Sequence, residues 1–248
     1  MSRGGIFSLL AVFLIGMLIP ISAASENFNF IISNSENWKD VYSIVHFATL
    51  RNAGSDFLVS TKHGPLLISS LNRNSDIRVI SSRRQPFSIN YADFLRSKGF
   101  SNADEITVND ANLELIEELP NINNFIIVGS NYGYDAIAVI PYAVQKKSWV
   151  FLADRNNIDE IVNIINGRSV KEILVYGYVD REVREGIARF NPTTLNSGDR
   201  FLDNIEIVKK FLEIKPMNQV LLSNGEFIEK EIMTGAEPVL FTGKENVP

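Results

Sequence analysis

The apolar and polar residues of this chain repeat one pattern at an interval of about 95 positions. Each copy begins with a short apolar segment, continues through a polar turn, and reaches an acidic residue that opens an amphipathic segment. Asp40 and Asp135 are 95 positions apart, and Asp135 and Glu229 are 94 apart. A fixed period of this kind predicts one supersecondary unit that is used several times. The copies cover residues 28–51, 124–147 and, in degenerate form, 219–237.

The apolar segments predict strands of parallel sheets. Residues 125–128 form a continuous apolar run between turn residues, which suits a strand that is buried on both faces. Strands and amphipathic helices alternate, and this order is typical of parallel sheets with right-handed crossovers. Further strands are expected at residues 30–32, 57–60, 77–80, 149–153 and 173–176. Helices are expected at residues 40–50, 90–98, 157–165 and 180–190, and from residue 135.

Two more amphipathic segments precede the second and third copies and predict linking helices. They cover residues 111–119 and 202–211, and Asp110 and Asp199 stand just before them. The third copy has apolar segments at 220–222 and 239–241. These strands are expected to complete or extend a neighbouring sheet, because a lone strand pair is marginal in water.

The expected fold class is therefore α/β, with tandem Rossmann-like βαβ repeats, parallel sheets and an incomplete third repeat. The first repeat is placed at residues 25–104, the second at 105–195 and the partial third at 196–248.

The first 24 residues have the features of a signal peptide. Arg3 supplies a positive charge, residues 6–21 are almost all apolar, and Ser22-Ala23-Ala24 places small residues at a cleavage site after Ala24. The alternative is an uncleaved signal anchor, although the apolar run is shorter than the roughly 20 residues of a spanning helix. Either interpretation predicts an extracellular or cell-surface location. We expect no other membrane span.

Composition narrows the classes of partner. The net charge is −5 and no basic cluster is present, which argues against nucleic acid or an anionic bilayer as the main partner. The chain has no Cys, which excludes disulfides, thiolate metal sites and a lipoprotein anchor. Arg83-Arg84 is a small basic pair that could meet an acidic polymer, although two basic residues in a loop are more often simply solvated.

Three short motifs, at residues 198–201, 240–242 and 129–137, resemble the cell-wall-binding repeat family of type 2. Gly198-Asp199-Arg200-Phe201 is similar to the helix start of that repeat, and Leu240-Phe241-Thr242 is similar to a later strand end. Gly129-Ser130, followed by Asp135-Ala136-Ile137, is similar to its strand end, loop and next helix. The resemblance implies Rossmann-like modules without catalytic activity that hold a protein to anionic wall polymers or pack into a surface layer. Homo-oligomerisation is left open.

The candidate site residues belong to the turns and helix starts, namely Asp40, Gly129, Ser130, Asp135, Asp199 and Arg200. The turn 129–133 could cradle a phosphate, but it lacks the dinucleotide spacing and Asp135 would repel the phosphate. We therefore interpret Asp135 as an acceptor for the amides of its own helix start. His46 and His63 are too few for a histidine-based metal site.

We predict no catalytic residue, metal or cofactor. The alternative function is an extracytoplasmic enzyme or small-ligand binder that uses a cleft at the carboxyl ends of the strands.

Overall fold

The structure is a computed structural model that describes residues 28–131 and 133–243. The expected signal peptide, residues 1–24, lies outside the described residues. In the described part of the chain, no helix has the length and apolar character needed to cross a membrane.

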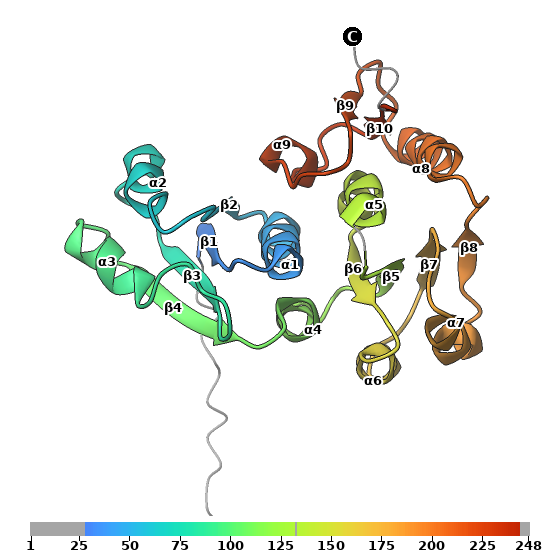
Figure 1. The fold of residues 1–248 in the computed structure, drawn as a ribbon, viewed down its shortest axis with the longest axis horizontal. Coiled ribbons are helices and arrows are strands. Elements are labelled where there is room, and N and C mark those ends of the chain that lie inside the picture. The colour runs from blue at the N-terminus through green and yellow to red at the C-terminus, as the bar shows by residue number, and fades with distance from the viewer. Residues whose placement is uncertain (1–27, 132, 244–248) are drawn as a thin grey trace, which may run out of the picture.

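The first unit is a four-stranded, wholly parallel sheet with strand order β2-β1-β3-β4. Its helices connect successive strands, as the alternating pattern predicts (Figure 1). The elements are β1 (Phe30–Asn34), α1 (Trp38–Leu50), β2 (Gly54–Phe57), α2 (Gly64–Ser70), β3 (Ile77–Ser82), α3 (Tyr91–Ser97) and β4 (Ala103–Val108).

The second unit repeats this arrangement with strand order β6-β5-β7-β8, again all parallel. It follows the linking helix α4 (Ala111–Glu114) and a 3-10 turn, Leu115–Glu118. Its elements are β5 (Asn124–Gly129), α5 (Gly133–Lys146), β6 (Ser148–Ala153), α6 (Ile158–Asn166), β7 (Glu172–Tyr176), α7 (Arg181–Ile187), a 3-10 turn (Ala188–Phe190) and β8 (Thr193–Leu195). The fold class predicted from the sequence is confirmed.

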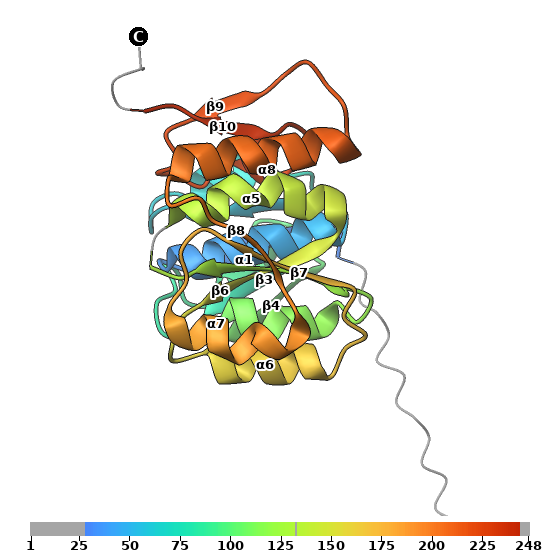
Figure 2. The same cartoon turned by 90° about the vertical axis from the view of Figure 1, so that its right-hand side faces the viewer.

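The central strands are continuously apolar because both of their faces are covered. Phe125 and Ile127 of β5 join the core beneath α6 and α7, whereas Ile126 and Val128 join the core under α5. Figure 2 shows the corresponding layers, with α5 and α8 on one side of this sheet and α6 and α7 on the other. Successive strand residues point to opposite faces, so a strand with two covered faces needs an apolar residue at every position.

The third unit comprises α8 (Arg200–Ile214), β9 (Leu221–Ser223), α9 (Lys230–Met233) and β10 (Val239–Phe241). The expectation that its strands extend a neighbouring sheet is wrong, because β9 and β10 pair only with each other in the described structure. This pair is stabilised by packing instead, since Val239 and Phe241 are buried in the same core as α5 and α8.

Three other sequence expectations need correction. The second strand lies at Gly54–Phe57 rather than at 57–60, and the edge strands β4 and β8 were not predicted. β4 pairs with β3 through Val108, so the expected boundary after residue 104 falls inside a strand. Both missed strands lie at sheet edges, where side chains are partly exposed and the apolar signal is weak.

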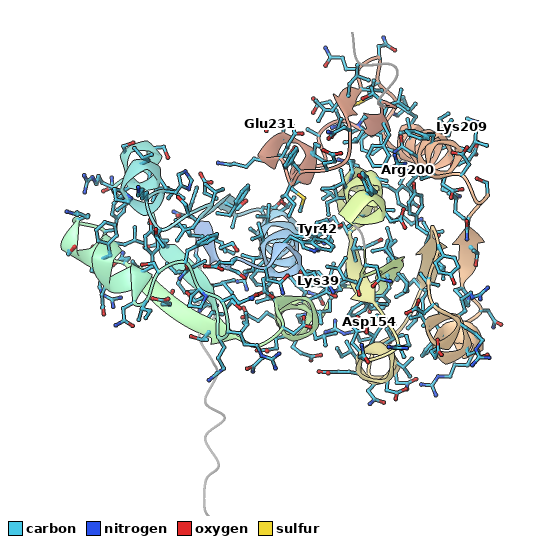
Figure 3. The ribbon with its side chains drawn as sticks, in the orientation of Figure 1. Lys39, Tyr42, Asp154, Arg200, Lys209 and Glu231 are labelled. Atoms are coloured by element: carbon cyan, nitrogen blue, oxygen red, sulfur yellow. The ribbon has the colours of Figure 1, made fainter. Side chains whose placement is uncertain are left out.

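The units are joined through their first helices. α1, α5 and α9 follow the first strand of each unit, and all three pack against one another (Figure 1). The linking helix α4 lies between α1 and β6, and α8 lies between α5 and β10. At the first junction, the Tyr42 hydroxyl donates to the Ala136 carbonyl at 3.0 Å (Figure 3). One buried core therefore runs through the first and second units.

Candidate functional site

The first sheet has a polar cleft of about 380 Å³ at the carboxyl ends of β3 and β4. Open α/β sheets place their ligands at this end of the strands. The cleft is larger than a single water site and falls within the usual range of small-ligand pockets, about 300–1,000 Å³. Its polar lining includes Ser81, Arg83, Asn90, Arg96, Glu105 and Thr107.

A hydrogen-bond network fixes the floor of this cleft. The buried Asn34 amide donates to Ser81 Oγ at 2.8 Å and to the Ser88 carbonyl at 2.7 Å. Ser81 Oγ donates to Glu105 Oε1 at 2.5 Å, and Glu105 Oε2 accepts from the Ala92 amide at 3.1 Å. These groups are fully used within the protein, so Ser81 is a structural hydroxyl rather than an activated nucleophile.

The arginines around the cleft differ in whether their guanidinium groups have partners within the protein. The Arg96 guanidinium donates to Asp93 and to the Ala103 carbonyl. Arg83 and Arg84 are exposed, and neither guanidinium forms an ion pair within the described residues. The cleft therefore combines hydrogen-bonding groups with a positive charge that remains available to an anionic ligand at its mouth.

Asp40 is the third residue of α1, and the structure places it in a buried junction. Its carboxylate accepts from Ser35 Oγ at 2.8 Å and from the backbone amide of Ala111 at 3.2 Å. Asn37, and not Asp40, caps the helix by accepting from the Lys39 amide. Asp40 thus ties the turn after β1 to the start of the linking helix α4.

Asp135 is the third residue of α5, the position equivalent to Asp40. No donor to its carboxylate is present among the described residues, which exclude residue 132 of the same turn, so the interpretation of Asp135 as an acceptor for its own helix start stays a prediction. Burial raises the pKa of Asp135 to about 6; nearby Asp203 adds to this effect and Arg200 opposes it. Gly177 has a φ of 69°, and a Cβ there would lie 2.3 Å from Asp135 Oδ2.

Gly129 and Ser130 end the central strand of the second unit. Ser130 Oγ donates to Asp154 Oδ2 at 2.8 Å, and the Ser130 amide donates to the Ala153 carbonyl at 3.0 Å. Gly129 and Asp135 line a cavity of about 220 Å³. This volume is below the usual range for small-ligand pockets. The second unit therefore has a smaller strand-end site than the first.

Asp199 is the N-cap of α8, as its place before an amphipathic segment predicts. Its carboxylate accepts from the amides of Phe201 and Leu202 at 2.8 and 3.2 Å. Arg200 is exposed, and its guanidinium carbon lies 4.5 Å from the ring centroid of Tyr134 (Figure 3). Asp135 and Arg200 are therefore close at the second junction, where Asp199 caps α8, whereas Asp40 belongs to the first junction.

A larger, apolar groove lies where the three units meet. Its volume is about 480 Å³, and its lining includes Trp38, Phe57, Val59, Phe87, Phe227 and Ile228. Sequence reasoning missed this groove because its residues come from separate units. It also missed the buried amides of Asn112 and Asn204. The sequence feature that could have revealed these buried amides is a single Asn within the apolar stripe of each linking helix.

Neither histidine lines the polar cleft. His46 is fully buried in α1 and stacks on Trp149, with ring centroids 5.1 Å apart, whereas His63 precedes α2. Burial lowers the pKa of His46 to about 3, and the nearby Ser148 backbone offsets this only in part. Within the described residues, no group of three or more His, Cys, Asp or Glu side chains could hold a metal ion.

Comparison with known proteins bears on the fold. No family model matches the chain, and no curated protein matches it. Among solved structures, Cwp8 from Clostridium difficile is similar with a TM-score of 0.65 at 16% identity, over 88% of this chain. The chain spans 41% of the length of that protein. At this level of identity the likeness establishes a shared fold.

Proposed function

We propose that this chain is an exported, non-catalytic protein of the cell envelope that binds an anionic wall polymer or a surface-layer partner. The single observation that carries the proposal is the polar cleft of the first unit, with exposed Arg83 at its mouth. A hydroxyl-rich polymer with negative charges matches both features, because the Asn90 amide and the Thr107 hydroxyl, which lie outside the network of the cleft floor, suit sugars and the exposed Arg83 guanidinium suits an anion. The fold likeness to Cwp8, a cell wall protein, supports the same compartment.

The test is co-sedimentation of the full chain with a purified anionic wall polysaccharide. The double variant Arg83→Gln with Arg84→Gln should weaken binding by roughly 2- to 30-fold, from about 0.2–1 kcal/mol for each exposed charge contact. Added salt should weaken the wild type more than this variant, because exposed charges are screened. The matched control is Arg181→Gln with Arg184→Gln, two exposed arginines of α7 that lie away from the cleft.

Equal binding of the cleft variant and the α7 variant would contradict the proposal. The experiment uses the full chain, because the first and second units share one core and a separated unit would expose it.

The second candidate is an extracytoplasmic enzyme or small-ligand binder that uses the same cleft. The observation in its favour is the cleft volume of about 380 Å³ at the carboxyl ends of the strands. Thermal-shift measurements with monosaccharides and sugar phosphates separate the two functions. A small ligand that stabilises the protein as strongly as the polymer favours this second candidate.

A further inference from the structure

Two sheet edges in this molecule are closed by the same device. In the second unit, the Asn112 amide of α4 donates to the Val150 carbonyl at 2.8 Å and accepts from the Leu152 amide at 2.9 Å. Val150 and Leu152 belong to the edge strand β6. One side chain therefore satisfies two peptide groups that an edge strand would otherwise leave unpaired.

The third unit repeats the device with different residues. The Asn204 amide of α8 donates to the Val239 carbonyl at 2.9 Å and accepts from the Phe241 amide at 2.8 Å. Val239 and Phe241 belong to β10 and are buried. Each linking helix thus covers the edge of the unit that follows it and presents one buried Asn to that edge.

The first unit has the equivalent edge without the helix. Ser55 and Phe57 of β2 stand 95 positions before Val150 and Leu152. The Phe57 amide donates to the carboxylate of its neighbour Asp56 at 2.9 Å, a local contact in place of one between a helix and the strand. Every residue of β6 is buried, whereas β2 has an exposed residue followed by three half-buried ones. No linking helix covers β2 in the described structure.

The helix that faces this edge is α9. Lys230 Nζ lies 2.8 Å from Asp56 Oδ2, and Thr49 Oγ1 donates to the Met233 carbonyl at 3.2 Å. α4 joins the first helix α1 to the edge strand β6, and α8 joins the first helix α5 to β10. The first helix α9 and the edge strand β2 are the remaining pair, and no linking helix joins them in the described structure. The apolar groove of about 480 Å³ opens beside this pair, with Phe57 and Val59 on one wall and Phe227 on another.

We propose that this groove is the docking site of a third linking helix, supplied by a further α/β repeat unit. The helix would carry one Asn, whose amide accepts from the Phe57 amide and donates to the Ser55 carbonyl. Its apolar face would cover Phe57 and Val59, as Ile207 and Phe211 of α8 are covered in the second junction. Glu36 and Glu226 at the groove would face the helix N-terminus, where negative charge is favourable.

The experiment appends a second copy of residues 196–216, which contain α8, to the end of the full chain through a flexible Gly-Ser linker. The tether offsets the ordering cost of a short helix by raising its effective concentration. The readout is amide hydrogen exchange at residues 54–59 and 226–234, together with the melting temperature. Exchange at Phe57 should slow at least tenfold and the melting temperature should rise. Asn204→Ala in the appended copy should reduce that protection factor by roughly tenfold.

Groove variants provide the second arm. Val59→Arg and Phe227→Arg change side chains that are 58% and 66% exposed, so the fold should tolerate them while the docked helix should not. The matched control is Leu66→Arg in α2, which is 68% exposed and lies outside the groove lining. Loss of protection in both groove variants, with protection kept in the control, supports the site.

Several outcomes overturn the proposal. No protection of residues 54–59 means that the groove does not accept the helix. Protection confined to β10 means that the appended copy replaces α8 in its own place. Protection that rises with protein concentration alone identifies a second copy of the chain, and protection by wall polysaccharide alone identifies a glycan. Polymer binding through Arg83 is measured separately, so the failure of one proposal leaves the other intact.

Discussion

The helices α1 and α5 occupy the same place in two units, yet their equivalent carboxylates have opposite surroundings. Asp40 accepts two hydrogen bonds, one of them from the Ala111 amide at the start of α4. At the second junction α8 begins one turn earlier relative to its buried Asn, so the residue equivalent to Ala111 is Asp203. The Asp203 amide is already used within its helix, and its carboxylate raises the pKa of Asp135 further. Because α8 starts one helical turn earlier than α4 relative to the buried Asn, the repeated carboxylate has favourable partners at the first junction and unfavourable surroundings at the second.

His46 provides the largest expected difference between the two helices, because α5 carries Pro141 at the equivalent position. The pKa of His46 is lowered to about 3 in the folded protein, so the unfolded chain binds its proton more readily. Stability is therefore lost as pH falls from about 6.5 toward 3. His46→Phe keeps the ring stacked on Trp149 and should be about 3 kcal/mol more stable than the wild type at pH 4. Urea unfolding at pH 4 and pH 8 measures this; a difference that is equal at both pH values contradicts it.

Asp40→Ala should lower the free energy of unfolding by about 2–3 kcal/mol, because it leaves the buried Ser35 hydroxyl and Ala111 amide without an acceptor. Asp135→Ala removes no hydrogen bond from the described residues and should cost little or nothing. Urea midpoints at pH 7 with unchanged slopes compare the two variants. Equal losses at both positions would show that the carboxylates have the same role after all.

Asp135→Asn should stabilise the protein at neutral pH. The folded pKa of Asp135 is raised to about 6 from its ordinary value of 3.8, so ionisation costs the folded state more than the unfolded chain. That penalty is absent below about pH 4 and complete above about pH 6. The variant should gain about 1–2 kcal/mol at pH 7 and nothing at pH 4, after allowing for partial exposure. A gain of the same size at pH 4 would point to packing rather than charge.

The smallest effect is expected at the helix caps of the two junctions. Asp199→Ala removes the acceptor for the Phe201 and Leu202 amides and should cost about 1 kcal/mol. Asp110→Ala removes the same kind of cap from α4, where the carboxylate accepts from the Asn112 and Leu113 amides. Because Asp199 is exposed, water can replace part of its contribution. Thermal unfolding should rank Asp110→Ala as the more damaging variant, and the reverse order would contradict this comparison.

The sequence was sufficient to predict the repeat and the parallel sheets, because strands covered on both faces must be apolar throughout, as residues 125–128 are. It was insufficient for β4 and β8, whose exposed edges remove that requirement. The position of Asp40 and Asp135 on equivalent helices was predictable from their spacing. Their different partners were not, because these depend on where α4 and α8 begin. The polar cleft joins Asn34, Ser81 and Glu105 from three strands, and no local pattern indicates that they meet.

The linking helices also impose an order on folding during synthesis. Asn112 leaves the ribosome about 40 residues before Leu152, the strand residue that it completes, and Asn204 likewise precedes Phe241. Each linking helix is therefore translated before the strand to which its Asn side-chain amide bonds. Each linking helix is fully hydrogen-bonded only after the unit that follows it has been translated, so the array should acquire its final stability in steps from the N-terminus onward.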